Sequence, residues 1–209
     1  MAKGRFITLE GGEGAGKSTQ ARRLAERLRA AGHEVALTRE PGGSPGAETI
    51  RELLVTGGAD RWSSVTEALL MYAARRDHIE RTIAPALERG AWVVSDRFAD
   101  STRAYQGAGG GVPASFIQAL ERYVLGELRP DLTLILDLPV EAAHARISRR
   151  NHAETRFEAK GEAFHQRLRE GFLAIARVEA DRCVVIDAAA PPKAVAEAIW
   201  SAVEARLAP

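Results

Sequence analysis

The sequence has a single cysteine, Cys183, so no disulfide can form within the chain. This excludes a small disulfide-stapled scaffold and favours a reducing compartment. Cys183 stands in an apolar run, where a buried strand residue is expected. Apolar runs are short everywhere, and none approaches the roughly 20 residues that cross a bilayer. No leader-like segment precedes the first apolar run. We therefore expect a cytoplasmic protein with no membrane partner.

Net charge is also nearly absent, at +1 from 29 basic and 28 acidic residues. This balance gives no overall basic field, so no nucleic-acid partner is expected. The five histidines are scattered without metal-ligand spacing. The chain is 45% hydrophobic and 27% charged, an ordinary balance for a globular protein. Its 209 residues favour one domain over residues 1–209.

A glycine-rich stretch near the start carries the strongest functional signal. An apolar run over residues 6–9 stops at glycines, and G-x-x-x-x-G-K-S follows from Gly11. Glycines let the backbone turn tightly and point several N–H groups at a phosphate, and the next helix adds its positive end. Lys17 can reach the β- and γ-phosphates, and the Ser18 hydroxyl can ligate Mg²⁺. The predicted ATP-binding residues are Gly11, Gly12, Glu13, Gly14, Ala15, Gly16, Lys17, Ser18 and Thr19.

Apolar runs alternate with helical patterns along the whole chain. Strands are predicted over residues 6–9, 34–38, 92–96, 132–137 and 183–186. Helices are predicted over 17–31, 47–54, 65–88, 113–125, 139–148, 159–178 and 192–207. This order predicts an α/β fold, a parallel sheet with helices on both faces. We also expect Ser63 or Ser64 to cap the long helix, a capping box between Ser64 and Glu67, and a loop over residues 98–111.

Three classes of phosphate-loop protein compete at this point. A GTPase should show an N-K-x-D-like stretch after a strand, and there is none. A regulatory or motor ATPase needs no second substrate site. A small-molecule kinase needs a cationic acceptor pocket and a basic segment that closes over the transferred group. Asp96 and Arg97 end the third predicted strand, and Arg75 lies on the long helix. The basic excess at Arg146, Arg149, Arg150 and Arg156 favours a lid at about residues 146–158, and hence the kinase.

Longer motifs make the assignment specific. The run D-R-x-x-x-S-T-x-A-Y-Q-G covers residues 96–107, and further matches lie at 9–19, 38–43, 50–54, 129–133 and 186–188. With these motifs the chain resembles bacterial thymidylate kinases along nearly its whole length. The resemblance implies a three-layer P-loop nucleoside monophosphate kinase fold with a five-stranded parallel sheet. It also implies conversion of dTMP to dTDP with Mg²⁺ and ATP, and a homodimer. Another nucleoside monophosphate kinase, or a regulatory ATPase, remains an alternative.

The resemblance also implies roles for individual residues. Glu13 meets the 3′-hydroxyl of the acceptor sugar, while Thr102 contacts the base edge. Arg51, Arg75 and Arg97 hold the acceptor phosphate and the transferring phosphoryl group, and Arg75 can also reach a base oxygen. Tyr105 and Gln106 lie beside the sugar, where a packed ring excludes a 2′-hydroxyl. The predicted dTMP-binding residues are Glu13, Arg51, Met71, Arg75, Arg97, Ser101, Thr102, Tyr105 and Gln106.

The family subtype and two departures from the family pattern shape the expected mechanism. No basic residue stands inside the phosphate loop, so the lid should supply the catalytic arginine, with Arg149 the first choice beside Lys17 and Arg97. Met71 occupies the position of the family's stacking aromatic, and the lid motif D-R-[FI]-E begins here with Thr155 instead of Asp. Ser18 and Asp96 are the expected Mg²⁺ residues.

Overall fold

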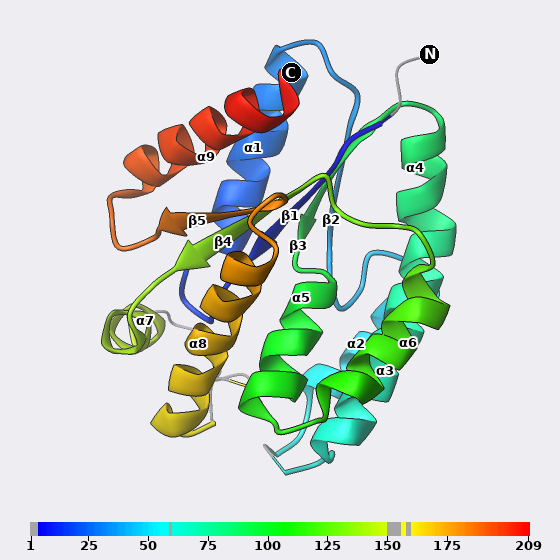
Figure 1. Cartoon of the computed structure of the whole chain (residues 1–209), viewed down its shortest axis with the longest axis vertical. Helices are drawn as coiled ribbons and strands as arrows, with labels where there is room; N and C mark the ends of the chain where they lie inside the picture. Colours follow the sequence, from blue (N-terminus) through cyan, green and yellow to red (C-terminus); the bar gives the residue numbers. More distant parts are fainter. Residues whose placement is uncertain (1–3, 59, 150–155, 158–159) are drawn as a thin grey trace.

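The computed structural model of the chain describes residues 4–58, 60–149, 156–157 and 160–209. Across these ranges five parallel strands form one sheet in the order β2-β3-β1-β4-β5 (Figure 1). The strands are β1 (Phe6–Glu10), β2 (Val35–Arg39), β3 (Trp92–Asp96), β4 (Leu132–Asp137) and β5 (Cys183–Asp187). The predicted five-stranded parallel sheet is confirmed.

Helices cover both faces of this sheet. They are α1 (Lys17–Ala30), α2 (Pro45–Val55), α3 (Ser64–His78), η1 (Ile79–Ile83), α4 (Ala84–Glu88), α5 (Ala99–Thr102), η2 (Arg103–Gly109), α6 (Ala114–Leu125), α7 (Val140–Ile147), α8 (Glu162–Val178) and α9 (Pro192–Leu207). Helices α1 and α9 lie side by side on one face, and α3 to α6 together with α8 lie on the other (Figure 1). The architecture is therefore the predicted three-layer one.

The apolar strands follow from this burial on both faces. Ile7 and Leu9 of β1 pack with α1 and α9, whereas Phe6 packs with α3, α4 and α6. On β4, Leu134 joins the first cluster and Ile135 packs against α8. A parallel strand between two helical layers has no solvent side, so its sequence reads as a continuous apolar run.

The long helix predicted over residues 65–88 is one continuous helical stretch with a change of pitch. Its middle, η1, is π-helical, and the Ala84 N–H donates to the Ile79 carbonyl five residues back. Pro85 follows directly and has no N–H to donate to the preceding turn. Ser63 caps the start, accepting from Thr66 N at 3.2 Å. The predicted capping box is wrong, because Glu67 is buried in contacts with other segments.

The loop predicted over residues 98–111 is also wrong. Most of this segment is helical, as α5 and η2, and it packs along α8. Ala104 and Tyr105 belong to the same buried cluster as Phe164, Leu168 and Phe172. Local glycine content therefore underestimates the helix, because burial against α8 outweighs the low helix propensity of glycine.

The carboxyl ends of the strands converge at one edge of the sheet. Leu9 pairs with Asp96, Arg39 also pairs with Asp96, and Glu10 pairs with Ile135. The residues that follow β1, β2 and β3 therefore meet in space, as expected for a ligand site in an open parallel sheet. Of the helices that the structure describes, none is both long and apolar enough to span a bilayer.

Candidate functional site

The phosphate loop is the turn between β1 and α1. Gly11 has φ 132°, and a Cβ there would lie 2.5 Å from the Leu136 carbonyl oxygen. Gly14 has φ 72°, and its Cβ would lie 3.0 Å from the Ala143 carbonyl oxygen. Both positions therefore require glycine, for the backbone angle and for the close approach of β4 and α7. Lys17 Nζ lies within the loop and donates to the Gly12 carbonyl at 2.6 Å.

A cleft of about 510 Å³ opens beside this loop. The residues assigned to dTMP on the sequence come from separate segments of the chain, yet all of them line it. They are Glu13, Arg51, Met71, Arg75, Arg97, Ser101, Thr102, Tyr105 and Gln106. Lys17, Ser18, Thr19 and Asp96 line the same cleft. One cleft thus joins the expected metal and acceptor residues with six of the nine expected donor-phosphate residues. Of the other three, Gly11 and Gly12 line a separate small cavity and Ala15 is buried.

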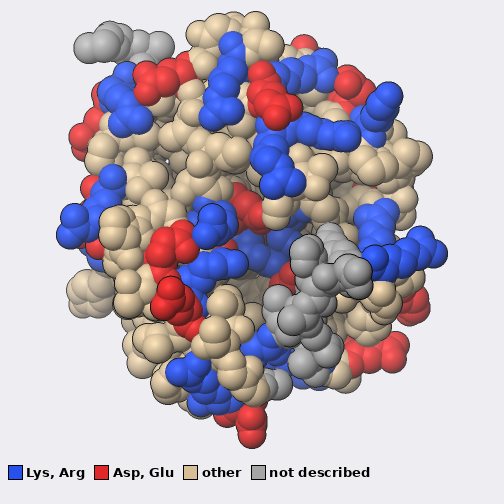
Figure 2. All heavy atoms as spheres, turned by 180° about the vertical axis from the view of Figure 1, so that it is seen from behind, with Lys and Arg blue, Asp and Glu red and all other residues tan. Residues whose placement is uncertain are grey.

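The cleft is more cationic than the chain as a whole. Its described lining contains six basic side chains, Lys17, Arg22, Arg39, Arg51, Arg75 and Arg97. It contains three acidic ones, Glu13, Glu40 and Asp96. Figure 2 shows Lys and Arg side chains around a hollow in which acidic side chains are also visible. Such a concentration of positive charge in a protein of net charge +1 suits an anionic ligand.

Arg97 lies at the centre of the cleft. It has φ 75°, a left-handed conformation that a non-glycine residue adopts only under strong local restraint. Its guanidinium donates to the Gly11 carbonyl at 3.0 Å, to Glu13 Oε1 at 2.8 Å and to the Tyr105 hydroxyl at 2.8 Å. The strained backbone therefore aims the side chain across the mouth of the phosphate loop.

The environment perturbs the pKa values of two groups on the phosphate loop. Burial by itself would raise the pKa of Glu13, but Arg97 and Lys17 outweigh it and lower that pKa to about 2. Burial, together with the positive charge of Arg97, lowers the pKa of Lys17 to about 8. Glu13 is thus an anion at neutral pH. Lys17 titrates just above neutrality before any anion binds beside it.

Ser18 and Asp96 form a pair suited to a hard cation. Ser18 Oγ donates to Asp96 Oδ2 at 2.5 Å. Asp96 Oδ1 is buried and accepts no hydrogen bond from the described residues. Those residues contain no cluster of three or more His, Cys, Asp or Glu side chains that could hold a metal. The oxygen atoms of this pair fit Mg²⁺, which is usually bound by one or two protein oxygens together with water and phosphate oxygens.

Arg75 is held in a buried network between segments that lie far apart in the sequence. Its Nε donates to Glu40 Oε2 at 2.7 Å, and its terminal nitrogens reach Thr102 Oγ1 at 3.2 Å. Glu40 Oε1 is also 2.9 Å from His78 Nδ1, and His78 Nε2 is 2.7 Å from Thr38 Oγ1. Glu40, itself held by His78, thus fixes the orientation of the Arg75 side chain. Glu40 lies in the stretch at residues 38–43 that matches the family motif. That match was the only sequence feature that could have pointed to Glu40, and it assigned no role to this residue.

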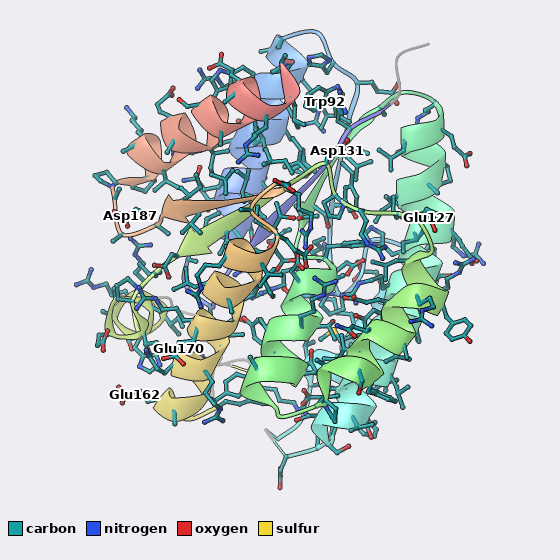
Figure 3. The ribbon with its side chains drawn as sticks, viewed as in Figure 1. Trp92, Glu127, Asp131, Glu162, Glu170 and Asp187 are labelled. Atoms are coloured by element: carbon teal, nitrogen blue, oxygen red, sulfur yellow. The ribbon has the colours of Figure 1, made fainter. Side chains whose placement is uncertain are left out.

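Packed aromatic side chains form one wall of the cleft. Tyr105 OH donates to Glu13 Oε1 at 2.8 Å. Its ring lies 5.7 Å from the Phe157 ring and 6.2 Å from the Phe172 ring, edge to face in both cases. Helix α8, which supplies Phe172, is marked in Figure 3 by Glu162 at its start and Glu170 farther along. Met71 packs against the same cluster. Phe157 lines the cleft but was not predicted as a site residue.

The predicted lid lies partly outside the described residues, which end at 149 and resume only at 156–157 and 160. Arg150, Thr155 and Glu158 fall in the gaps. Arg149 is exposed just after α7 and does not line the cleft in this structure. Arg156 is buried and contacts Glu67. The catalytic role of Arg149 stays a prediction.

Comparison with known proteins gives one consistent result. Residues 9–199 match the model of the family described as thymidylate kinase. The chain is 69% identical to the thymidylate kinase of Caulobacter vibrioides over 207 residues, 99% of each chain. It is 53% identical to that of Nitrobacter hamburgensis over 209 residues, 99% of this chain and 91% of the relative.

A solved structure is similar over almost the same span. The crystal structure of thymidylate kinase from Ehrlichia chaffeensis superposes with a TM-score of 0.76 at 35% sequence identity. The match covers 96% of this chain and 99% of that one. Sequence and fold therefore point to the same family.

Proposed function

The chain belongs to the thymidylate kinase family and phosphorylates dTMP to dTDP, and we propose that it does so in the cleft between the phosphate loop and α3, with Mg-ATP as donor. One observation carries this proposal. Six of the nine residues expected to bind the donor phosphates, including Lys17 and Ser18, line a single cleft with all of the residues expected to bind the acceptor. A kinase needs both substrates in contact, whereas a regulatory ATPase needs only the first.

The chemistry asks for little acid–base help from the protein. A phosphate oxygen of dTMP attacks the γ-phosphorus of ATP. One O–P bond forms, the bond to the β-phosphate oxygen breaks, and ADP leaves. The attacking oxygen is ionised at neutral pH, so catalysis consists of positioning and charge neutralisation. Lys17 and Arg97 supply positive charge on the protein side. Ser18 and Asp96 would hold Mg²⁺, which would supply further neutralisation of the phosphate charge.

Glu13 and Tyr105 are the residues that we propose to contact the deoxyribose of dTMP. We assign the Glu13 carboxylate to the 3′-hydroxyl, because it is ionised and offers an acceptor at the cleft. Tyr105 stands beside it with its hydroxyl bonded to Glu13 and its ring packed against Phe157 and Phe172. A ring held on so many sides cannot move aside for a 2′-hydroxyl, and that hydroxyl would lose its hydrogen bonds to water.

Lys17→Ala tests whether this cleft is the active site. The variant removes the cation nearest the donor phosphates, so turnover of dTMP should fall by several orders of magnitude in a direct assay of ADP formation. Arg23→Ala is the matched control, because it removes an exposed positive charge from the same helix outside the cleft lining and should leave kcat unchanged. A folded Lys17→Ala variant with near-wild-type kcat would contradict the proposal.

We also propose that residues 1–209 form one cytoplasmic domain that pairs with a second copy. All described elements pack around a single sheet, which supports one domain. Leu53, Val65 and Leu69 leave 40–48% of their surfaces exposed on neighbouring helices α2 and α3, which supports a dimer through this face. Light scattering should give twice the chain mass, and Leu69→Glu should lower it toward the monomer.

A further inference from the structure

The most connected buried charge outside the cleft lining, among the residues described, is Arg156. Its side chain is fully buried against segments about 90 to 100 residues earlier in the chain. The guanidinium donates to the carbonyls of Gly58 at 2.8 Å, Leu54 at 3.1 Å and Trp62 at 3.4 Å. The same group forms an ion pair with Glu67 in the first turn of α3. Arg156 therefore joins the end of α2, the α2–α3 connection and α3 in one contact.

Glu67 connects Arg156 to Gln106, a residue of the cleft lining. One of its carboxylate oxygens receives Arg156, and the other accepts from Gln106 Nε2 at 2.9 Å. Glu67 and Arg156 do not line the cleft, whereas Gln106 does. Glu67 and Arg156 therefore lie behind Gln106 and do not form part of the cleft lining.

The chemistry of this contact fixes which way the Gln106 amide faces. An ionised carboxylate accepts hydrogen bonds and donates none, so it must receive the NH₂ end of the amide. The carbonyl oxygen is the end that remains, and no described residue donates to it. Gln106 therefore offers the cleft an acceptor.

Gln106 lies four residues after Thr102, the residue expected at the base edge, and both line the cleft, so we assign its amide to the base and not to the sugar that the resemblance implies. We propose that Arg156 and Glu67 are positioning residues that hold Gln106 in this orientation and so select an acceptor base with an N–H at its ring edge. The inference rests on the activity toward dTMP. The thymine ring of dTMP carries an N–H at position 3, and dUMP carries the same group. Cytosine has a lone pair at that position, which would face the Gln106 oxygen unfavourably.

Glu67→Gln gives a sharp test because it should reverse the Gln106 amide. The carbonyl of the new amide at position 67 would stay with the positive Arg156, which leaves its NH₂ facing Gln106. Gln106 would then turn its own oxygen toward that NH₂ and its own NH₂ toward the cleft. The preference in kcat/KM for dTMP over dCMP should fall by roughly tenfold to a hundredfold, with KM for ATP unchanged.

The exchange variant Glu67→Gln with Gln106→Glu separates positioning from mere stability. It keeps the total charge and again places an acceptor oxygen on the cleft, so the preference for dTMP should return. Glu121→Gln is the matched control. Glu121 is equally buried and paired with Arg103, away from the cleft lining, so its loss should lower the melting temperature without changing the preference.

The outcomes are distinguishable. A wild-type enzyme that turns over dCMP as well as dTMP would count against the proposed function itself. A wild-type enzyme that prefers dTMP, with a folded Glu67→Gln variant of unchanged preference, would overturn only the positioning role. If Glu67→Gln does not fold, the exchange variant and Gln106→Leu are measured instead. If Gln106→Leu keeps the wild-type preference for dTMP over dCMP, the inference is contradicted. If Gln106→Leu loses this preference and the exchange variant keeps it, the inference is supported.

Discussion

The pH dependence of ATP capture follows from the burial of Lys17. Burial and Arg97 lower its pKa from 10.5 to about 8 in the protein without ligands. Only the protonated amine attracts phosphate, and kcat/KM reports the protonation state of the free enzyme. At one pH unit above this pKa roughly a tenth of the enzyme is competent, so kcat/KM for ATP should fall about tenfold per unit above pH 8.

In contrast to kcat/KM for ATP, kcat should remain constant to a higher pH. Bound phosphates place negative charge beside the amine and raise its pKa, so the enzyme–ATP complex stays protonated where the free enzyme does not. The measurement is ADP formation in quenched samples from about pH 6 to 10 at saturating dTMP, with Mg-ATP varied. Circular dichroism at each pH shows that the protein remains folded. A kcat/KM that stays flat across this range would refute the reasoning.

A second group complicates the assignment and calls for a control. Burial and the charge of Asp100 raise the pKa of Glu10 to about 8, although hydrogen bonds from Ser101 and Phe98 favour its ionised form. The folded pKa lies above the ordinary 4.5, so this group stabilises the protein below pH 4.5 and loses that contribution as pH rises through 8. Lys17→Arg keeps its charge throughout the range. If the affinity of Lys17→Arg for an ATP analogue no longer falls above pH 8, the fall in the wild type is due to Lys17. If the affinity of this variant still falls above pH 8, the titrating group is Glu10.

Two further predictions concern the lid and the sugar wall. Arg149→Ala should lower kcat far more than it raises KM for ATP, because an arginine acting on the migrating phosphoryl group contributes mainly in the transition state; an unchanged kcat would move the role to Arg146 or Arg150. Tyr105→Ala should reduce the kcat/KM preference for dUMP over UMP by roughly tenfold or more, since these acceptors differ only in the 2′-hydroxyl that the ring excludes; an unaltered ratio would remove Tyr105 from sugar selection.

Much of the site could be predicted because its determinants are local. Gly11 and Gly14 take backbone angles that favour glycine, so the phosphate loop carries its geometry in its composition. The inner strands β1, β3 and β4 are buried on both sides and therefore read as apolar runs. Parallel strands bring their carboxyl ends to one edge, so residues after β1 and β3 were expected to meet, and Glu13 and Arg97 do meet.

The rest depends on contacts between distant segments. Glu67 has the spacing of a capping-box residue, but its carboxylate contacts Arg156 and Gln106, because a buried guanidinium without an acidic partner would be costly. Arg156 belongs to the basic segment predicted as a lid, and its burial against Glu67 has no local sequence signal. The Glu40–His78 contact likewise joins residues 38 positions apart and has no local sequence signal.

The most direct test of the central claim is a label-transfer assay with the wild-type enzyme. ATP labelled at the γ-phosphate is supplied with Mg²⁺ and, in turn, dTMP, dUMP, CMP, UMP, AMP or GMP, and both ADP and the labelled product are quantified. We expect one dTDP per ADP, with dTMP the best acceptor. ADP formed without a labelled nucleotide, or a higher kcat/KM for any of the purine or ribose acceptors, would contradict it.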